Sequence, residues 1–81
     1  MVFFVYLLQC GDDSLYCGYA KNVDARVALH RAGRASKYTR SRLPVKVVHV
    51  ESFPSQRAAM CREAEIKTFS RKKKLELIRA N

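Results

Sequence analysis

Apolar positions in the first part of the chain follow first a strand pattern and then a helical one. Residues 2–9 form an apolar run rich in aromatic and β-branched side chains, which predicts a strand. After a turn rich in Gly, Asp and Ser, residues 15–20 predict a second strand that completes a hairpin. A helix is predicted from Val23 to Ala32, with Asn22 as its N-cap and Gly33 as its C-cap.

The rest of the chain adds one strand and at least two helices. Residues 35–43 are basic and weakly patterned, which indicates a loop or a short helix that Pro44 ends. Residues 45–53 are rich in valine and predict a third strand. A helix capped by Ser55 follows, and Ser70 caps a final short helix. The apolar contacts of the longer helix are Ala59, Met60, Ile66 and Phe69.

The order β-β-α-(α)-β-α-α predicts an α/β fold of the α+β type, with a small three-stranded antiparallel sheet flanked by helices. With 81 residues, 48% of them hydrophobic, the chain is expected to form one domain over residues 1–81. No apolar run approaches the roughly 20 residues that cross a bilayer, and the start of the chain reads as a strand and not as a signal peptide. Three cysteines without metal-ligand spacing are expected to be reduced and half-buried, as in a cytoplasmic protein.

Charge narrows the class of partner. Sixteen Lys and Arg residues against seven Asp and Glu give a net charge of +9. A basic surface spread through a folded domain predicts a polyanionic partner, most often nucleic acid. The alternative is a basic protein without such a partner. The excess recurs at Arg31, Arg34, Lys37, Arg40 and Arg42, and again at residues 71–74.

The segment from Tyr16 to His30 concentrates polar chemistry between the second strand and the first helix. Arg26 and His30 lie four residues apart, so they emerge on one face of that helix. Gly18 indicates a place where a side chain would obstruct a turn, a ligand or another backbone. These residues indicate an assembled site, and the alternative is a solvated helix face with an isolated histidine. The other histidine, His49, lies in the third predicted strand without an evident partner.

Glu63 is the acidic residue that the pattern singles out. It lies four residues after Ala59 and three before Ile66, so it shares the face of its helix that is expected to pack inward. A carboxylate there needs a partner, which is either a bound cation or a nearby arginine. No second carboxylate has matching placement, so the sequence argues for at most one divalent ion, and Mg²⁺ suits a single carboxylate.

Tyr6 and Tyr16 reach one site only if the hairpin register allows it, because side chains alternate across a strand. An even, two-residue turn would place their side chains on opposite faces of the sheet. A connection of three residues, or of five with a bulge, would pair Tyr6 with Ala20 and place both tyrosines on the face of Gly18, with space for a phosphate between the rings. The alternative role for either tyrosine is simple sheet packing. Catalytic use would call for a lowered tyrosine pKa, which neighbouring cations such as Lys21 or Arg26, or a metal-bound site, could supply.

Taken together, these motifs resemble the GIY-YIG nuclease superfamily, and in particular its small stand-alone bacterial proteins. The two signature tripeptides stand here as Phe4-Val5-Tyr6 and Tyr16-Cys17-Gly18. The first keeps only its tyrosine, and Cys17 stands where the family has an aliphatic residue. The last residue is Asn81, and the chain shows no clear counterpart of the family's distal Asn. The remaining matches are Lys21-Asn22-Val23, Arg26, His30, Lys37-Tyr38-Thr39, Pro44, Arg62-Glu63 and Ile66-Lys67.

The resemblance implies a metal-dependent endonuclease that hydrolyses phosphodiester bonds in DNA, with Mg²⁺ or Mn²⁺ and no small-molecule cofactor or membrane partner. Glu63 would hold the metal, and Arg26 would stabilise the charge that develops on the phosphate. Tyr6 and Tyr16 would orient or deprotonate the attacking water, with His30 in support. Two alternatives remain, a non-catalytic nucleic-acid binding module and a structural subunit that meets an acidic protein. The residues expected to bind DNA are Lys21, Arg34, Lys37, Arg40 and Arg42.

Overall fold

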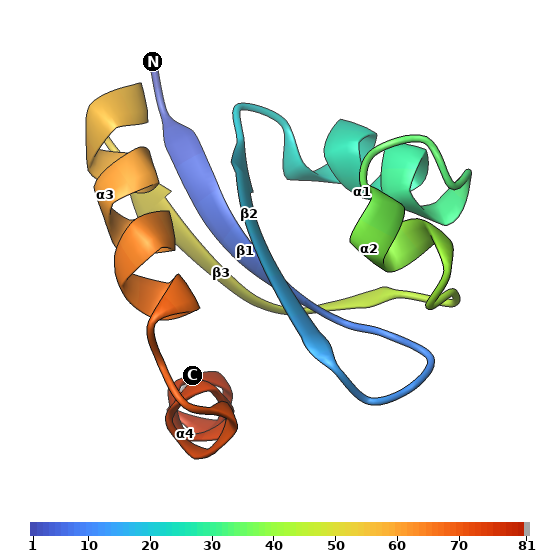
Figure 1. The fold of residues 1–81 in the computed structure, drawn as a ribbon. Coiled ribbons are helices and arrows are strands. Elements are labelled where there is room, and N and C mark those ends of the chain that lie inside the picture. The colour runs from blue at the N-terminus through green and yellow to red at the C-terminus, as the bar shows by residue number, and fades with distance from the viewer. Residues whose placement is uncertain (81) are drawn as a thin grey trace.

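A computed structural model describes residues 1–80 and contains a single three-stranded antiparallel sheet (Figure 1). Strands β1 (Phe3–Gln9), β2 (Leu15–Ala20) and β3 (Lys46–Phe53) lie in the order β2-β1-β3. β1 is therefore the central strand, and β2 and β3 are the edges. This confirms the predicted sheet, the α+β class and the predicted order of elements.

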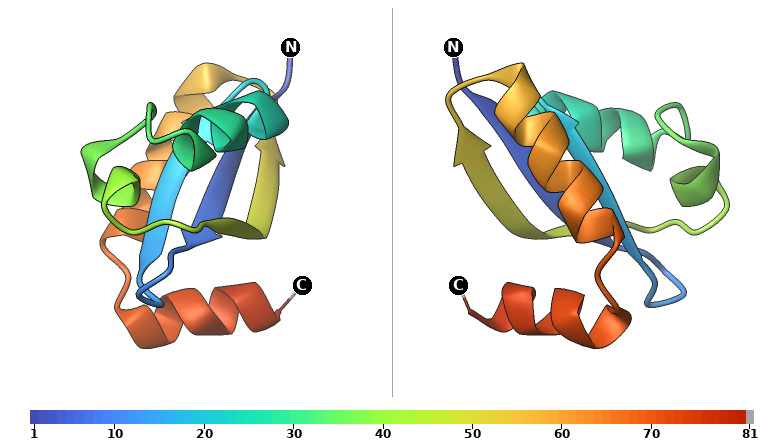
Figure 2. Two further views of the ribbon diagram at one scale, coloured as in Figure 1. Left: turned by 90° about the vertical axis from the view of Figure 1, so that its right-hand side faces the viewer. Right: turned by 60° about the vertical axis from the view of Figure 1, so that its left-hand side comes forward.

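Within residues 1–80, four helices complete the fold and cover both faces of the sheet (Figure 2). Helices α1 (Val23–Arg31) and α2 (Lys37–Arg40) lie on one face, and α3 (Gln56–Lys67) lies on the other, with α4 (Arg71–Arg79) across the end of the sheet. The basic stretch that was open between loop and helix thus contains one helical turn. Among residues 1–80, no helix is long and apolar enough to cross a membrane.

Side-chain caps explain where the helices begin. The side chains of Asn22 and Ser55 accept hydrogen bonds from backbone N–H groups three residues later, at 3.0 and 3.1 Å, as predicted. Ser70 does the same for α4, and Ser36, which was not predicted as a cap, accepts from the Tyr38 N–H. Gly33 is not the C-cap itself but follows it in the left-handed region with φ of +74°.

The core has two halves because the side chains of β1 alternate between the two faces of the sheet. Tyr6 and Leu8 point toward α1, whereas Val5 and Leu7 point toward α3, and all four are buried. The cysteines are free, and Cys10 and Cys17 belong to these core clusters. Cys61 is exposed on α3, so the expectation of three half-buried cysteines is wrong for that residue.

The hairpin has the predicted parity but not the predicted pairs. Its connection spans residues 10–14, an odd number, and Tyr6, Tyr16 and Gly18 share one face as expected. However, Tyr6 lies opposite Gly18 and not opposite Ala20. The shift by two residues arises because Cys10 already closes the turn, with its N–H donating to the Ser14 carbonyl at 2.9 Å.

His49 does have a partner, contrary to the sequence interpretation. Its Nε2 lies 2.7 Å from an oxygen of Glu51, which points to the same face of the sheet two residues later. Arg62 of α3 donates to both oxygens of this carboxylate, at 2.8 and 3.1 Å, and also binds Glu65 at 2.6 Å. This network ties β3 to α3.

The Glu51 network predicts a loss of stability in acid. Hydrogen bonds from Arg62 hold the pKa of the Glu51 carboxyl below its usual range, so its contribution is present above the unfolded-state pKa and is lost as the pH falls through the lower folded-state pKa. We expect Glu51→Gln to lower the unfolding temperature at pH 7, and the difference from wild type to shrink below about pH 4, followed by circular dichroism. Glu76→Gln serves as the matched control because Glu76 has no ion pair among residues 1–80. A difference that is independent of pH would contradict this account.

Candidate active site

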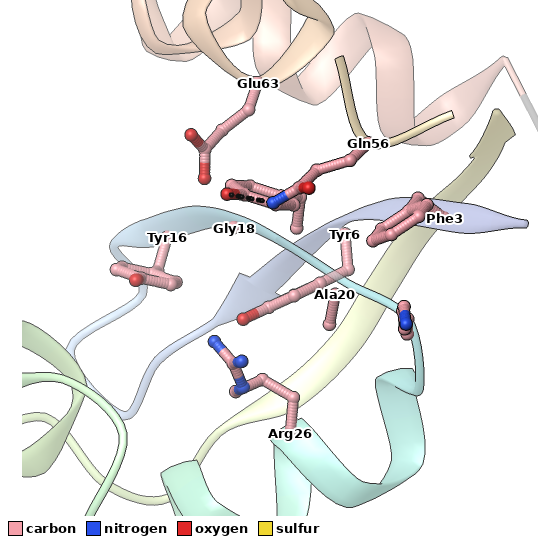
Figure 3. A pocket seen from close by; sticks show the side chains of 10 residues that line it. Phe3, Tyr6, Tyr16, Gly18, Ala20, Arg26, Gln56 and Glu63 are labelled. Carbon is pink, nitrogen blue, oxygen red and sulfur yellow. Dashed lines mark hydrogen bonds between the residues drawn. The ribbon is translucent and has the colours of Figure 1, made fainter. Parts of the chain in front are cut away.

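A cavity of about 380 Å³ opens at the β2 edge of the sheet (Figure 3). Glu63 reaches it from α3 and Arg26 from α1, so the two side chains approach β2 from opposite faces of the sheet. Tyr6 and Tyr16 line the space between them. The structure thus gathers four of the five candidate catalytic residues around one cavity, with the first helix and the later helix in the predicted places.

The fifth candidate, His30, lies behind Tyr6 in the core. Its Nε2 is 2.9 Å from the Tyr6 hydroxyl oxygen, and its Nδ1 is 2.7 Å from Oγ1 of Thr39 in α2. The Tyr16 ring packs edge-on against the imidazole, with 5.1 Å between the ring centroids. His30 is therefore not on a solvated helix face. Thr39 received no role from the sequence, although it belongs to a stretch already matched to the family, because only the fold places it beside His30.

Gly18 lets the ring of Tyr6 pass across β2. A Cβ atom at this position would lie 2.5 Å from the Tyr6 hydroxyl oxygen and 2.7 Å from the ring carbon that bears it. Both contacts are too close for real atoms. Gly18 therefore leaves room for the Tyr6 hydroxyl, and it lines the cavity together with both tyrosines, so the space predicted for a phosphate stays a prediction.

Burial and charge keep Tyr6 protonated and His30 neutral. Burial raises the pKa of Tyr6 well above its usual value, Tyr16 and Glu63 add to the rise, and Arg26 opposes it. The predicted lowering by cations is thus outweighed. Burial also lowers the pKa of His30, and the nearby Arg26 lowers it further. At neutral pH the pair is a phenol beside an uncharged imidazole.

Glu63 has a free approach to the cavity. Its side chain is 18% exposed, and its ion-pair partner among residues 1–80 is the more exposed Lys67, at 3.6 Å on the same helix. The arginine next to it in the sequence, Arg62, binds Glu51 and Glu65. Within the described chain no three His, Cys, Asp or Glu side chains cluster to hold a metal. A single carboxylate in an open cavity fits Mg²⁺, which keeps several waters and takes phosphate oxygens as its other ligands.

The candidate DNA-binding residues differ in their exposure and in their hydrogen-bond partners. Lys21 lines the cavity, and Arg34, Lys37 and Arg40 are exposed. Arg42 has structural partners, because its guanidinium donates to Asp12 at 3.1 Å and to the Tyr38 carbonyl at 2.9 Å, and stacks 3.9 Å from the Tyr38 ring centre. It thereby holds α2 against the hairpin turn. Asn81 lies outside the described residues.

Comparison of the sequence with protein families and with known proteins shows which family the chain belongs to. The family model described as "GIY-YIG catalytic domain" matches residues 2–76. The chain belongs to the GIY-YIG family. This GIY-YIG domain is 55% identical over 75 residues to a UPF0213 protein of Staphylococcus haemolyticus. The matched residues make up 93% of this chain and 92% of that protein. It is 56% identical to a UPF0213 protein of Natronomonas pharaonis, over 93% of this chain and 88% of that protein.

A solved structure shares the fold of this GIY-YIG domain. The solution NMR structure of a UPF0213 protein from Bacillus halodurans superposes with a TM-score of 0.65 at 43% sequence identity. The match covers 100% of this chain and 86% of that chain. The small proteins named UPF0213 are therefore close relatives, which confirms the resemblance seen in the sequence.

The contact between Tyr6 and Gly18 predicts that this GIY-YIG domain does not tolerate alanine at position 18. We expect Gly18→Ala to lower the free energy of unfolding by about 1–3 kcal/mol, because the added methyl group displaces the buried Tyr6 ring. Urea denaturation followed by circular dichroism measures this. In a Tyr6→Phe background the same change should cost less, because the atom nearest to the new methyl group is gone. Equal costs in the two backgrounds would rule out the hydroxyl contact.

Proposed function

We propose that this GIY-YIG domain is a metal-dependent endonuclease that hydrolyses phosphodiester bonds in DNA with one Mg²⁺ or Mn²⁺ ion. The observation that carries the proposal is the convergence of Tyr6, Arg26 and Glu63 on one open cavity of a domain with a net charge of +9. Membership of a family whose domain is described as catalytic supports it.

Each side chain has a distinct task in this proposal. Arg26 contacts the scissile phosphate and stabilises the negative charge that develops on its oxygens. Glu63 holds the metal ion, which supplies Lewis-acid polarisation of the phosphate when bound. Tyr6 and Tyr16 orient the attacking water through their hydroxyl groups, and the water loses its proton to Tyr6. Lys21, Arg34, Lys37 and Arg40 attract the DNA backbone.

A non-catalytic nucleic-acid binding module is the second candidate. Two observations favour it, namely the single carboxylate at the cavity and the ion pair that Glu63 makes with Lys67. Binding alone would use the same basic surface but would not depend on Glu63. The two candidates therefore differ in what the loss of this carboxylate does.

Exchange of the carboxylate tests the catalytic proposal. Incubation with nicked, branched and single-stranded DNA in Mg²⁺ or Mn²⁺ should give cleavage that Glu63→Gln and Arg26→Ala each reduce by about 100-fold or more. Glu63→Gln should leave DNA binding intact or slightly stronger, because it removes one negative charge near the phosphate. The matched control is Glu65→Gln, which removes a carboxylate on the same helix that binds Arg62 and does not line the cavity. Cleavage that survives Glu63→Gln would point to a contaminating nuclease or to a structural role for Glu63.

The affinity for DNA should fall as the salt concentration rises, because neutralised phosphates release counterions. If about five phosphates are neutralised, the slope of log affinity against log salt concentration should be roughly −4 to −5 on duplex DNA. Fluorescence anisotropy with a labelled duplex measures the slope. Lys37→Gln should make it shallower by about 1, whereas Arg57→Gln, a change at an exposed position of α3 that is not a predicted DNA contact, should not. An affinity that does not change with salt would contradict the choice of nucleic acid as partner.

A further inference from the structure

We propose that Thr39 is a positioning residue that fixes His30 in the tautomer protonated on Nδ1, so that Nε2 accepts the proton of Tyr6. The inference rests on the proposed endonuclease activity for its catalytic meaning. The arrangement itself can be tested without any cleavage.

The proposed direction of each hydrogen bond gives every proton one acceptor. In this arrangement the Thr39 hydroxyl directs its one proton to the Ser36 carbonyl, whose oxygen lies 3.4 Å away, and turns its lone pairs to His30. The contact of 2.7 Å between Thr39 Oγ1 and His30 Nδ1 is then a hydrogen bond donated by Nδ1–H. A neutral imidazole with its proton on Nδ1 has a bare Nε2. That nitrogen then accepts from the Tyr6 hydroxyl at 2.9 Å.

The surroundings keep these three partners together. Thr39 is 0% exposed, and Tyr6 and His30 are each 1% exposed, so bulk water does not replace these partners. The Tyr16 ring, whose centroid lies 5.1 Å from that of the imidazole, packs against its side. α2 is held in place by its Ser36 cap, and Arg42 donates to the carbonyl of Tyr38. The acceptor for Nδ1–H is thus part of a fixed turn.

The proton transfer balances with the groups present. The attacking water gives a proton to the Tyr6 oxygen while the proton of Tyr6 passes to His30 Nε2. The oxygen of the water forms a bond to phosphorus, the bond from phosphorus to the leaving oxygen breaks, and that oxygen takes a proton from solvent. His30 then carries protons on both nitrogens and still donates from Nδ1 to Thr39. Tyr6 can act in this way despite its burial because its own proton leaves in the same step.

The charges around His30 set the acid limit. The groups that face the imidazole are Tyr6 of β1, Tyr16 of β2 and Thr39 of α2, and the charged Arg26 of α1 lies near it. Burial and Arg26 lower the pKa of His30, so the accepting form persists to a pH below the usual value of about 6.5. Below the lowered pKa of His30, Nε2 is protonated, and it can no longer accept the proton of Tyr6.

The tautomer is measured directly by NMR. Long-range ¹H–¹⁵N spectra of the ¹⁵N-labelled protein at pH 8 should show the His30 proton on Nδ1. In Thr39→Val, which keeps the shape of the side chain but removes the acceptor, the proton should move to Nε2, and Thr39→Ser should restore the wild-type pattern. The His49 signals serve as the internal control for folding. A wild-type His30 protonated on Nε2, or a Thr39→Val spectrum unchanged from wild type, would overturn the inference.

Cleavage kinetics give the second measurement. Thr39→Val should lower kcat by about 100-fold with little change in KM, and Thr39→Ser should recover most of the loss. A Thr39→Val protein that shifts the tautomer but cleaves at the wild-type rate would also overturn the inference. If the wild-type protein cleaves no DNA, the proposed function fails, and the tautomer spectra alone then decide whether Thr39 positions His30.

Discussion

The close approach of Tyr6 to Gly18 is the constraint on which the site depends. Tyr6 belongs to the central strand, where both faces are buried, so its ring is part of the core. Its hydroxyl reaches the cavity at the sheet edge only because β2 carries no side chain at the point of crossing. One residue therefore serves both the packing of the α1 face and the lining of the cavity. The odd connection in the hairpin places Tyr16 on the same face, beside His30.

The Glu63 carboxylate faces the cavity, where a cation can reach it. The guanidinium of Arg62 binds Glu51 of β3 and Glu65 of α3, whereas Glu63, the next residue along the helix, leaves α3 in a different direction. Glu51 is in turn fixed by its place on β3 beside His49. At the β2 edge of the sheet, the ion-pair partner of Glu63 among residues 1–80 is the exposed Lys67. The network that joins β3 to α3 and the proposed metal site therefore use different sides of α3.

The sequence predicts the helices and strands and the shared face of the two tyrosines. It does not predict the residue pairs of the hairpin or the side-chain contacts between distant elements. Periodicity and capping residues act locally, so Asn22, Ser55 and Ser70 could be recognised from their neighbours. The parity of the hairpin also follows from local alternation, but its pairs depend on where the turn closes, which the backbone of Cys10 and Ser14 decides. Arg62 and Glu51 meet through tertiary packing, and no local signal pairs them.

The chemistry of the site shows the same division. Arg26 and His30 could be chosen because a helix places residues four apart on one face. The pKa of Tyr6 could not be anticipated, because desolvation by the fold outweighs the nearby Arg26. Thr39 belongs to the motif Lys37-Tyr38-Thr39, but its partner does not follow from the motif, because its contact with His30 joins α2 to α1 through the fold.

The one-turn helix α2 points in two directions at once. Thr39 faces inward to His30, while Lys37 and Arg40 of the same turn face solvent. α2 is a single turn of four residues, so the same short stretch of backbone presents two cations to solvent and carries the hydroxyl that contacts the imidazole in the core.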